Sequence, residues 1–370
     1  MTVEIHEGLG SLPTDVRELW AGLVTSGGYN PSLHPSWLGS TLTAWGLSRS
    51  TRVAVVRQAD TVAVIPFLIR RRTLMGLPLH ALELASNVFC YHAEIVCSGS
   101  LEAALAEFLR DRNLPSWDVF RADNVVSGGP TQQAMRAVNM FAGISSRAGE
   151  RSPYTLIDRD WTAYLATRAK KVRANVLRSQ RMMKEAGETG MIWFESNSDV
   201  RRLLDDMLQI ETRSWKADAG VAIIAGTPQC EYYQQLLPWL ADIGALVANV
   251  LYIKEQPCAY TLCAAWQGWI GQLKTSFVAE LRDAGSRVMH CSLERAFQRG
   301  GREYDFLGDV APHKTRWADS IRPHEDLWAF SKGLRGRLLA RLKTLADRRY
   351  ERRRQAQAAA AQQAEQGESS

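Results

Sequence analysis

The order of the expected helices and strands constrains this chain more than any single motif does. In the first half, helices at Thr14–Ser26 and Ser36–Trp45 precede strands at Arg52–Gln58, Thr61–Ile69, Leu79–Ala85 and Ala93–Cys97, then a helix at Leu101–Arg112, a strand at Trp117–Arg121 and a helix at Thr131–Met140. The second half opens with a basic helix at 161–186, a strand at Met191–Glu195 and helices at Val200–Trp215 and Gln229–Ile243. It continues with strands at Leu246–Ile253, Cys258–Trp266 and Trp269–Ser276, a helix at Ser286–Gly300 and a strand at Tyr304–Leu307. Helices, antiparallel strands, helix and strand therefore occur twice, which predicts an α+β fold of two similar units.

The charge of the chain is concentrated in its last segment. Ten of the 45 Lys and Arg residues lie between Lys332 and Arg354, against two acidic residues, so most of the net charge of +6 belongs there. A basic helix is expected at Gly333–Tyr350, with leucines on one side. The Ala/Gln-rich stretch from Gln355 is expected to be disordered. This helix is either a solvated appendage or a surface that contacts anionic lipid or RNA.

Three parts follow from these patterns: residues 1–155, residues 156–330, and a basic helix with a disordered tail at 331–370. The chain has no run of the roughly 20 apolar residues that would cross a bilayer. The N-terminus lacks the basic start and apolar run of a signal peptide, which favours the cytoplasm. The six cysteines have no zinc-site spacing, so they are interpreted as inert buried thiols and no metal site is predicted.

One strand–loop–helix segment carries the clearest chemical signal. Between Gly271 and Met289, a strand leads into a loop whose Gly285 and Ser286 directly precede a helix. The first turn of a helix offers unpaired N–H groups and the positive end of the helix dipole, which suit a phosphate. Arg282 and Arg287 would add positive charge, so the segment predicts a phosphate or pyrophosphate site.

This segment and five other motifs resemble the GNAT superfamily. The motifs are spread over 156–330: Arg173–Arg178, Glu211–Lys216, the hairpin Leu251–Leu262, the loop Ala284–Ser286, Glu303–Gly308 and His313–Trp317. They are most similar to the CelD-like branch, which is associated with cellulose and polysaccharide biosynthesis and is related to the FemAB peptidyltransferases. The resemblance implies a tandem GNAT (acyl-CoA N-acyltransferase-like) fold, with two mixed or antiparallel sheets flanked by helices and a degenerate N-terminal copy.

The resemblance also implies a reaction and a set of site residues. An acyl group, for which acetyl is the first expectation, would be transferred from acetyl-CoA or another acyl-CoA to an amine or hydroxyl of a small molecule or saccharide. The donor would lie against Arg282, Gly285, Ser286 and Arg287, and Asp305 would be the general base unless a chain of waters serves. The acceptor would be bordered by Arg173, Trp215, Lys216, Lys314 and Trp317.

Two features leave other functions open. The family loop usually reads Ser-Pro-Gly, whereas this chain has Asp283 before Ala284-Gly285-Ser286, which places a negative charge where a phosphate is expected. A FemAB-like transferase that uses aminoacyl-tRNA shares the fold and would account for the basic helices. A non-catalytic GNAT-like subunit of a polysaccharide biosynthesis complex would account for the altered loop. His92 is either a structural histidine or a titratable group facing a cleft between the halves.

Overall fold

The structure of the chain is a computed structural model that describes residues 2–58, 60–86 and 89–367. Side chains are described for these residues except Thr189, Arg282, Glu351 and those after 352. The first half contains β1 (Thr2–Glu7), α1 (Thr14–Ser26), α2 (Pro35–Ala44), β2 (Thr51–Gln58), β3 (Thr61–Leu74), β4 (Leu77–Leu84), β5 (Val96–Ser98), α3 (Leu101–Arg110), β6 (Val119–Val126), α4 (Pro130–Ala137) and β7 (Phe141–Leu156).

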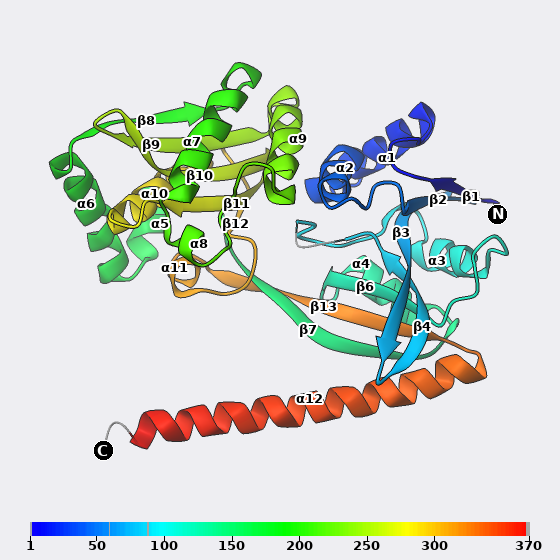
Figure 1. Cartoon of the computed structure of the whole chain (residues 1–370). Helices are drawn as coiled ribbons and strands as arrows, with labels where there is room; N and C mark the ends of the chain where they lie inside the picture. The colour runs from blue at the N-terminus through cyan, green and yellow to red at the C-terminus, as the bar shows by residue number, and fades with distance from the viewer. Residues whose placement is uncertain (1, 59, 87–88, 368–370) are drawn as a thin grey trace.

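The second half again has helices, then antiparallel strands, a long helix and a short strand. It contains α5 (Trp161–Thr167), α6 (Lys170–Glu185), β8 (Glu188–Phe194), α7 (Val200–Thr212), α8 (Trp215–Asp218), α9 (Pro228–Asp242), β9 (Leu246–Ile253), β10 (Gln256–Trp266), β11 (Trp269–Phe277), α10 (Arg282–Gln298), β12 (Glu303–Asp305), α11 (Pro312–Thr315) and β13 (Ser320–Ser331). The chain continues as α12 (Leu334–Gly367), which follows the edge of the molecule below the rest of the fold in Figure 1.

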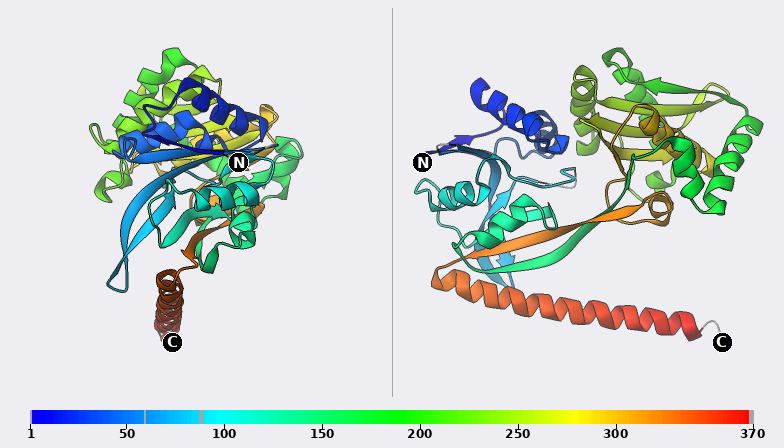
Figure 2. Two further views of the ribbon diagram at one scale, coloured as in Figure 1. Left: turned by 90° about the vertical axis from the view of Figure 1, so that its right-hand side faces the viewer. Right: turned by 180° about the vertical axis from the view of Figure 1, so that it is seen from behind.

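Each half gives its last strand to the other half. In the described residues one sheet has the strand order β1-β2-β3-β4-β6-β13-β7-β12-β11-β10-β9-β8, with β5 beside β3. Thus β7 pairs with β12 of the second half, while β13 pairs with β6 of the first half. β7 and β13 also pair with each other and form a two-stranded ribbon that joins the halves (Figures 1 and 2).

Both halves contain one short parallel contact at the same place in this order. β4 pairs with β6 over Ala81–Glu83, and β11 pairs with β12 over Trp269–Gly271. The other strand pairs are antiparallel, apart from an isolated bridge at Ala93. The repeated position of the parallel contact confirms the predicted tandem α+β fold, and the exchanged strands join the two predicted sheets into one.

The core of the second half lies on both faces of its sheet. All eight residues of β9 are buried, because helices cover both sides of that strand. One cluster packs β9 and β10 against α7 and α9, and others pack the opposite face against α6 and α10. The predicted bounds of β9 are confirmed, since its unbroken run of apolar residues is the sequence pattern of a doubly covered strand.

Several expectations differ from the structure. The long basic helix predicted at 161–186 is two helices, α5 and α6, with a break at Arg168 and Ala169. α12 continues to Gly367, through residues expected to be disordered, which agrees with the high helix propensity of Ala, Gln and Glu. Residues 368–370 lie outside the described residues.

Candidate functional site

A cavity opens where β11 and β12 separate. The two strands pair only as far as Gly271 and Asp305, after which β12 ends while β11 continues to Phe277. The cavity has a volume of about 740 Å³ and is lined by β11 residues Gln272–Thr275 and Phe277, α10 residues Gly285, Ser286 and Met289, α8 residues Trp215 and Lys216, the 306–308 loop, α11 residues His313 and Lys314, and Tyr91, Val221, Gln229 and Arg316. Five of the predicted site residues therefore surround one space: Trp215, Lys216, Gly285, Ser286 and Lys314.

Two of the cavity lysines share one buried carboxylate. Glu211 on α7 is fully buried, and its Oε atoms lie 3.4 Å from Lys216 Nζ and 3.8 Å from Lys274 Nζ. The Tyr260 hydroxyl and the Ile223 backbone N–H also donate hydrogen bonds to Glu211, at 2.7 and 3.1 Å. Glu211 is not among the residues that line the cavity, so it balances part of the lysine charge from within the wall.

Burial makes these lysines weaker bases than exposed ones. It lowers the pKa of Lys274 to about 8, with the charge of Lys216 acting in the same direction and Glu211 against it. Burial also lowers the pKa of Lys216 and of Lys314. His313 at the cavity has a lowered pKa through burial and the charges of Lys314, Arg316 and Lys216, so its imidazole is neutral at neutral pH.

α10 begins at Arg282, four residues before the predicted start at Ser286, so Gly285 and Ser286 lie within the helix and not in a loop before it. The start of α10 is closely packed around Gly285. A Cβ atom at this position would lie 2.4 Å from the Phe277 ring, so the ring of the last β11 residue requires a glycine here. The Asp283 carboxylate turns away and accepts a hydrogen bond from Arg178 Nη2 on α6 at 2.6 Å. The negative charge that departs from the family loop is therefore paired with a cation of the basic helix.

Three predicted arginines, Arg173, Arg282 and Arg287, are not among the described residues that line the cavity. Arg287 is turned toward Glu188, His290 and Cys291, and only 17% of its side chain is exposed. Arg173 donates hydrogen bonds to the carbonyl oxygens of Ala166 and Arg168, where it holds the junction between α5 and α6. The side chain of Arg282 lies outside the described part of the chain.

Trp317 belongs to a hydrophobic core, although it follows Lys314 by only three residues. It is 2% exposed and stacks on Trp161 with ring centroids 6.2 Å apart. Its carbonyl accepts hydrogen bonds from the Tyr164 hydroxyl and from Arg168. α11 ends at Thr315, so the chain turns inward before Trp317, whereas Lys314 stays at the cavity.

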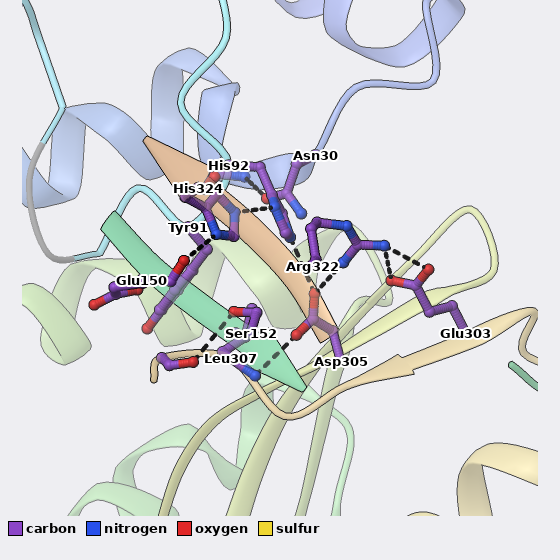
Figure 3. A network of polar contacts seen from close by, with 12 residues as sticks. Asn30, Tyr91, His92, Glu150, Ser152, Glu303, Asp305, Leu307, Arg322 and His324 are labelled. Atoms are coloured by element: carbon purple, nitrogen blue, oxygen red, sulfur yellow. Dashed lines mark hydrogen bonds and ion pairs between the residues drawn. The ribbon is translucent and has the colours of Figure 1, made fainter. Parts of the chain in front are cut away.

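Asp305 lies at the seam between the two halves, with its carboxylate in a polar network (Figure 3). Its Oδ2 accepts hydrogen bonds from Arg322 at 2.6 Å and from His92 at 3.1 Å, and its Oδ1 accepts one from the Leu307 backbone N–H at 2.9 Å. Burial alone would favour the neutral acid. The hydrogen bond from His92 and the charges of His92 and Arg322 outweigh it and hold the pKa of Asp305 below its ordinary value. Both oxygens of the Asp305 carboxylate therefore accept hydrogen bonds from the protein, and Asp305 is not among the residues that line the cavity.

The polar network continues from Asp305 through two histidines. His92 Nδ1 lies 3.1 Å from His324 Nε2, and His324 Nδ1 lies 3.2 Å from the Glu150 carbonyl oxygen. Burial, with the charge of His92 acting in the same direction, lowers the pKa of His324 to about 4. His92 therefore joins the halves through Asp305 and His324, and it also lines a second cavity together with Trp269 and Arg322.

Asp305 also shapes the edge of the cavity through the residues that follow it. Its hydrogen bond to Leu307 N stabilises a turn in which Leu307 and Gly308 both have positive φ, 49° and 61°. Lys314 Nζ donates to the carbonyl oxygens of Leu307 and Asp309 in the same turn. Asp305 is therefore placed to position the loop that carries cavity residues 306–308.

Sequence reasoning missed Lys274 and Tyr91 as cavity residues. Lys274 lies within the strand–loop–helix segment that was singled out, and its apolar neighbour Leu273 gave the only local sign of burial. Tyr91 comes from the first half, and nothing in its local sequence predicts contact with β11. The described residues contain no His, Cys, Asp and Glu cluster that could hold a metal, and none of their helices is both long and apolar enough to cross a bilayer.

Comparison with known proteins agrees with this geometry. The family model described as "Acetyltransferase (GNAT) domain" matches residues 170–315. No curated protein matches the chain. Among solved structures, FemX has a TM-score of 0.56 at 12% identity, covering 89% of this chain and 98% of FemX.

Two further solved structures share the fold. L-PGS from Bacillus licheniformis has a TM-score of 0.54 at 13% identity and covers 92% of this chain and 98% of that one. The C-terminal domain of a putative lysylphosphatidylglycerol synthetase from Agrobacterium fabrum has a TM-score of 0.55 at 10% identity, covering 85% and 91%.

The fold and the cavity define a tandem GNAT-like protein. Residues 170–315 match the GNAT domain model, and they contain α10, the β11–β12 separation and the described cavity-lining residues other than Tyr91 and Arg316. The whole chain shares its fold with FemX and L-PGS.

Proposed function

We propose that this protein transfers an acyl group from acyl-CoA to an amine or hydroxyl of a small molecule or saccharide, in the cavity between β11 and the 306–308 loop. The charge of the cavity carries this proposal. Lys216, Lys274, Lys314 and Arg316 line it, and no Asp or Glu is among the described lining residues. Such a wall attracts the phosphate groups of coenzyme A.

The same charge pattern favours acyl-CoA over aminoacyl-tRNA as the donor. An aminoacyl group carries an ammonium beside its reacting carbonyl, and an ammonium in this cavity would meet cations without a free carboxylate. Glu211 lies within the wall and is already shared by two lysines. Aminoacyl transfer remains the second candidate because the fold resembles those of FemX and L-PGS.

The residues of the cavity have separable roles in this proposal. The N-terminal part of α10, whose Gly285 and Ser286 line the cavity, would receive the donor phosphates, and Trp215 would border the acceptor. Attack of the acceptor nitrogen or oxygen on the thioester carbonyl breaks the C–S bond, and the acceptor proton finally reaches the thiolate. Lys274 is our candidate for the proton transfer, since its pKa of about 8 lies near neutral pH. Asp305 would hold the 306–308 loop in place.

Isothermal titration of the full chain with acetyl-CoA, compared with a charged tRNA, tests the donor. Ser286→Glu places a carboxylate at the cavity end of α10 and should weaken acetyl-CoA binding by about 100-fold. The matched control is Ser116→Glu, an exposed serine in the first half, which should leave binding unchanged. Binding of charged tRNA alone would favour aminoacyl transfer, and binding of neither ligand would favour a non-catalytic subunit.

A second measurement tests Lys274. Thiol release from acetyl-CoA, followed with a panel of amines and amino sugars, should fall by about 100-fold or more in Lys274→Met, the usual range for a general base. Acetyl-CoA affinity should fall much less. An unchanged rate would remove Lys274 from proton transfer. A saccharide acceptor and a place in polysaccharide biosynthesis rest on the sequence resemblance alone, and the panel addresses the acceptor directly.

A further inference from the structure

We propose that the outward face of α12 binds the surface of an anionic lipid bilayer, which goes beyond the acyl transfer proposed above. One side of α12 is fixed to the sheet. Leu339 is 2% exposed in a cluster with Leu79 and Phe330. Lys343 Nζ lies 2.5 Å from Asp347, which also accepts a hydrogen bond from Ser145 of β7. The Arg147 guanidinium lies 4.0 Å from the centre of the Tyr350 ring. These contacts determine which face of the helix points outward.

The outward face carries a row of exposed leucines. Leu334, Leu338 and Leu345 are 86%, 53% and 49% exposed. Their spacings of four and seven residues put them on one line along the helix, opposite Leu339 and Lys343. A row of this kind on a free helix face matches the apolar side of an interfacial helix, which enters a bilayer to the depth of the headgroups.

Basic side chains lie between and beside these leucines. Arg341, Arg348, Arg349 and Arg352 are exposed, and among the described side chains none forms an ion pair with them. Asp347, the acidic side chain of α12 that the structure describes, is turned inward to Lys343 and Ser145. The outward face therefore combines uncompensated positive charge with apolar surface, as a helix lying on anionic lipid requires.

A cationic groove borders the same face and can receive a headgroup phosphate. It has a volume of about 540 Å³ and lies between α12 and the start of β7, with Lys332, Arg337, Arg341 and Thr344 in its wall. No carboxylate is among its described lining residues. Lys332 donates to the Asn139 side-chain oxygen and Arg337 to the Lys332 carbonyl, so neutral acceptors leave their charges uncompensated.

The leucines distinguish lipid from nucleic acid as the partner. The phosphate backbone of RNA would need only the arginines. RNA contacts that add affinity beyond charge use exposed aromatic or polar side chains. Tyr350, which could stack on a base, is 46% exposed, but its ring already contacts the Arg147 guanidinium. Exposed leucines between the arginines are explained by a bilayer and not by RNA.

Sedimentation of the full chain with phosphatidylcholine vesicles, with and without phosphatidylglycerol, tests the proposal. Binding should require phosphatidylglycerol. The triple variant R341Q/R348Q/R352Q should lose about 100-fold in partitioning, because each arginine near an anionic surface contributes roughly fivefold. L338S/L345S should also lose binding at unchanged charge. These side chains are exposed, so unfolding transitions should stay close to that of the unchanged protein.

Matched controls separate this face from general basicity. R71Q/R112Q/R201Q removes the same charge from exposed arginines elsewhere, and Leu177→Ser removes a leucine that is 70% exposed on the basic helix α6. Both controls should bind vesicles as the unchanged protein does. Loss of binding in a control but not in the α12 variants would overturn the proposal. So would tRNA retardation in gels that depends on the α12 arginines but not on its leucines, without vesicle binding.

Discussion

The buried charge of Lys274 should make the stability of this protein depend on pH in a predictable way. The folded protein lowers the pKa of this lysine from 10.5 to about 8, and 10% of its side chain is exposed. Between these pH values the unfolded chain binds a proton that the folded protein does not, so the free energy of unfolding rises with pH. At 1.36 kcal/mol per pKa unit, the charged lysine costs about 3 kcal/mol below pH 8, and nothing above 10.5.

Urea unfolding of Lys274→Met across about pH 7 to pH 10 isolates this contribution. Relative to the unchanged protein, the variant should be most favoured near pH 7, and its advantage should shrink by about 2–3 kcal/mol toward pH 10. Other groups that titrate in this range are present in both proteins and largely cancel in the difference. Lys184→Met is the control, since Lys184 is exposed on α6.

A difference between Lys274→Met and the unchanged protein that does not vary with pH would refute the reasoning. A pH dependence equal to that of Lys184→Met would do the same. Either result would mean that water reaches Lys274 in the folded protein, and the case for Lys274 in proton transfer would fall with it.

Three further predictions concern residues around the cavity. Asp305→Asn should lower the free energy of unfolding by about 1–3 kcal/mol, because it removes the charge of the hydrogen-bonded acceptor while Arg322 keeps its ion pair with Glu303; an unchanged free energy in urea titrations would show that the seam is hydrated. Arg178→Gln should weaken acetyl-CoA binding by about fivefold in titration calorimetry, because it leaves the charge of Asp283 unpaired, and Asp283→Asn in the same background should restore it. Trp317→Ala should lower the free energy of unfolding by about 3–5 kcal/mol through loss of core packing. A variant with full stability in thermal unfolding but no acceptor turnover would instead support the predicted contact of Trp317 with the acceptor.

The repeated order of elements was predictable because its signals are local. The apolar run of β9 is contained in eight residues, whereas α10 begins at Arg282, four residues before the start predicted from Gly285-Ser286. The ribbon of β7 and β13 was not predictable in this way. β7 contains two glycines and a proline, and much of it is exposed, so it shows neither apolar alternation nor an apolar run.

Prediction of the site from the sequence was limited in the same way, because its contacts join distant parts of the chain. Lys216 and Lys314 were predicted at the cavity, but the sharing of Glu211 by Lys216 and Lys274 joins residues from α7, α8 and β11, and no local pattern reports it. Asp305 was expected as a base from the resemblance to the GNAT superfamily. Its three partners come from positions 92, 307 and 322, which only the tertiary fold brings together.

The exchange of β7 and β13 determines when this protein can finish folding during its synthesis. β6 lacks one neighbour until residues 320–331 have left the ribosome, although every other strand of the first half has been made more than 160 residues earlier. The nascent first half therefore waits with an open strand edge, which is a site for wrong pairing between chains. Cutting the gene between the halves would make that wait permanent, so two separately produced halves should aggregate alone and recover the fold only when they are made together.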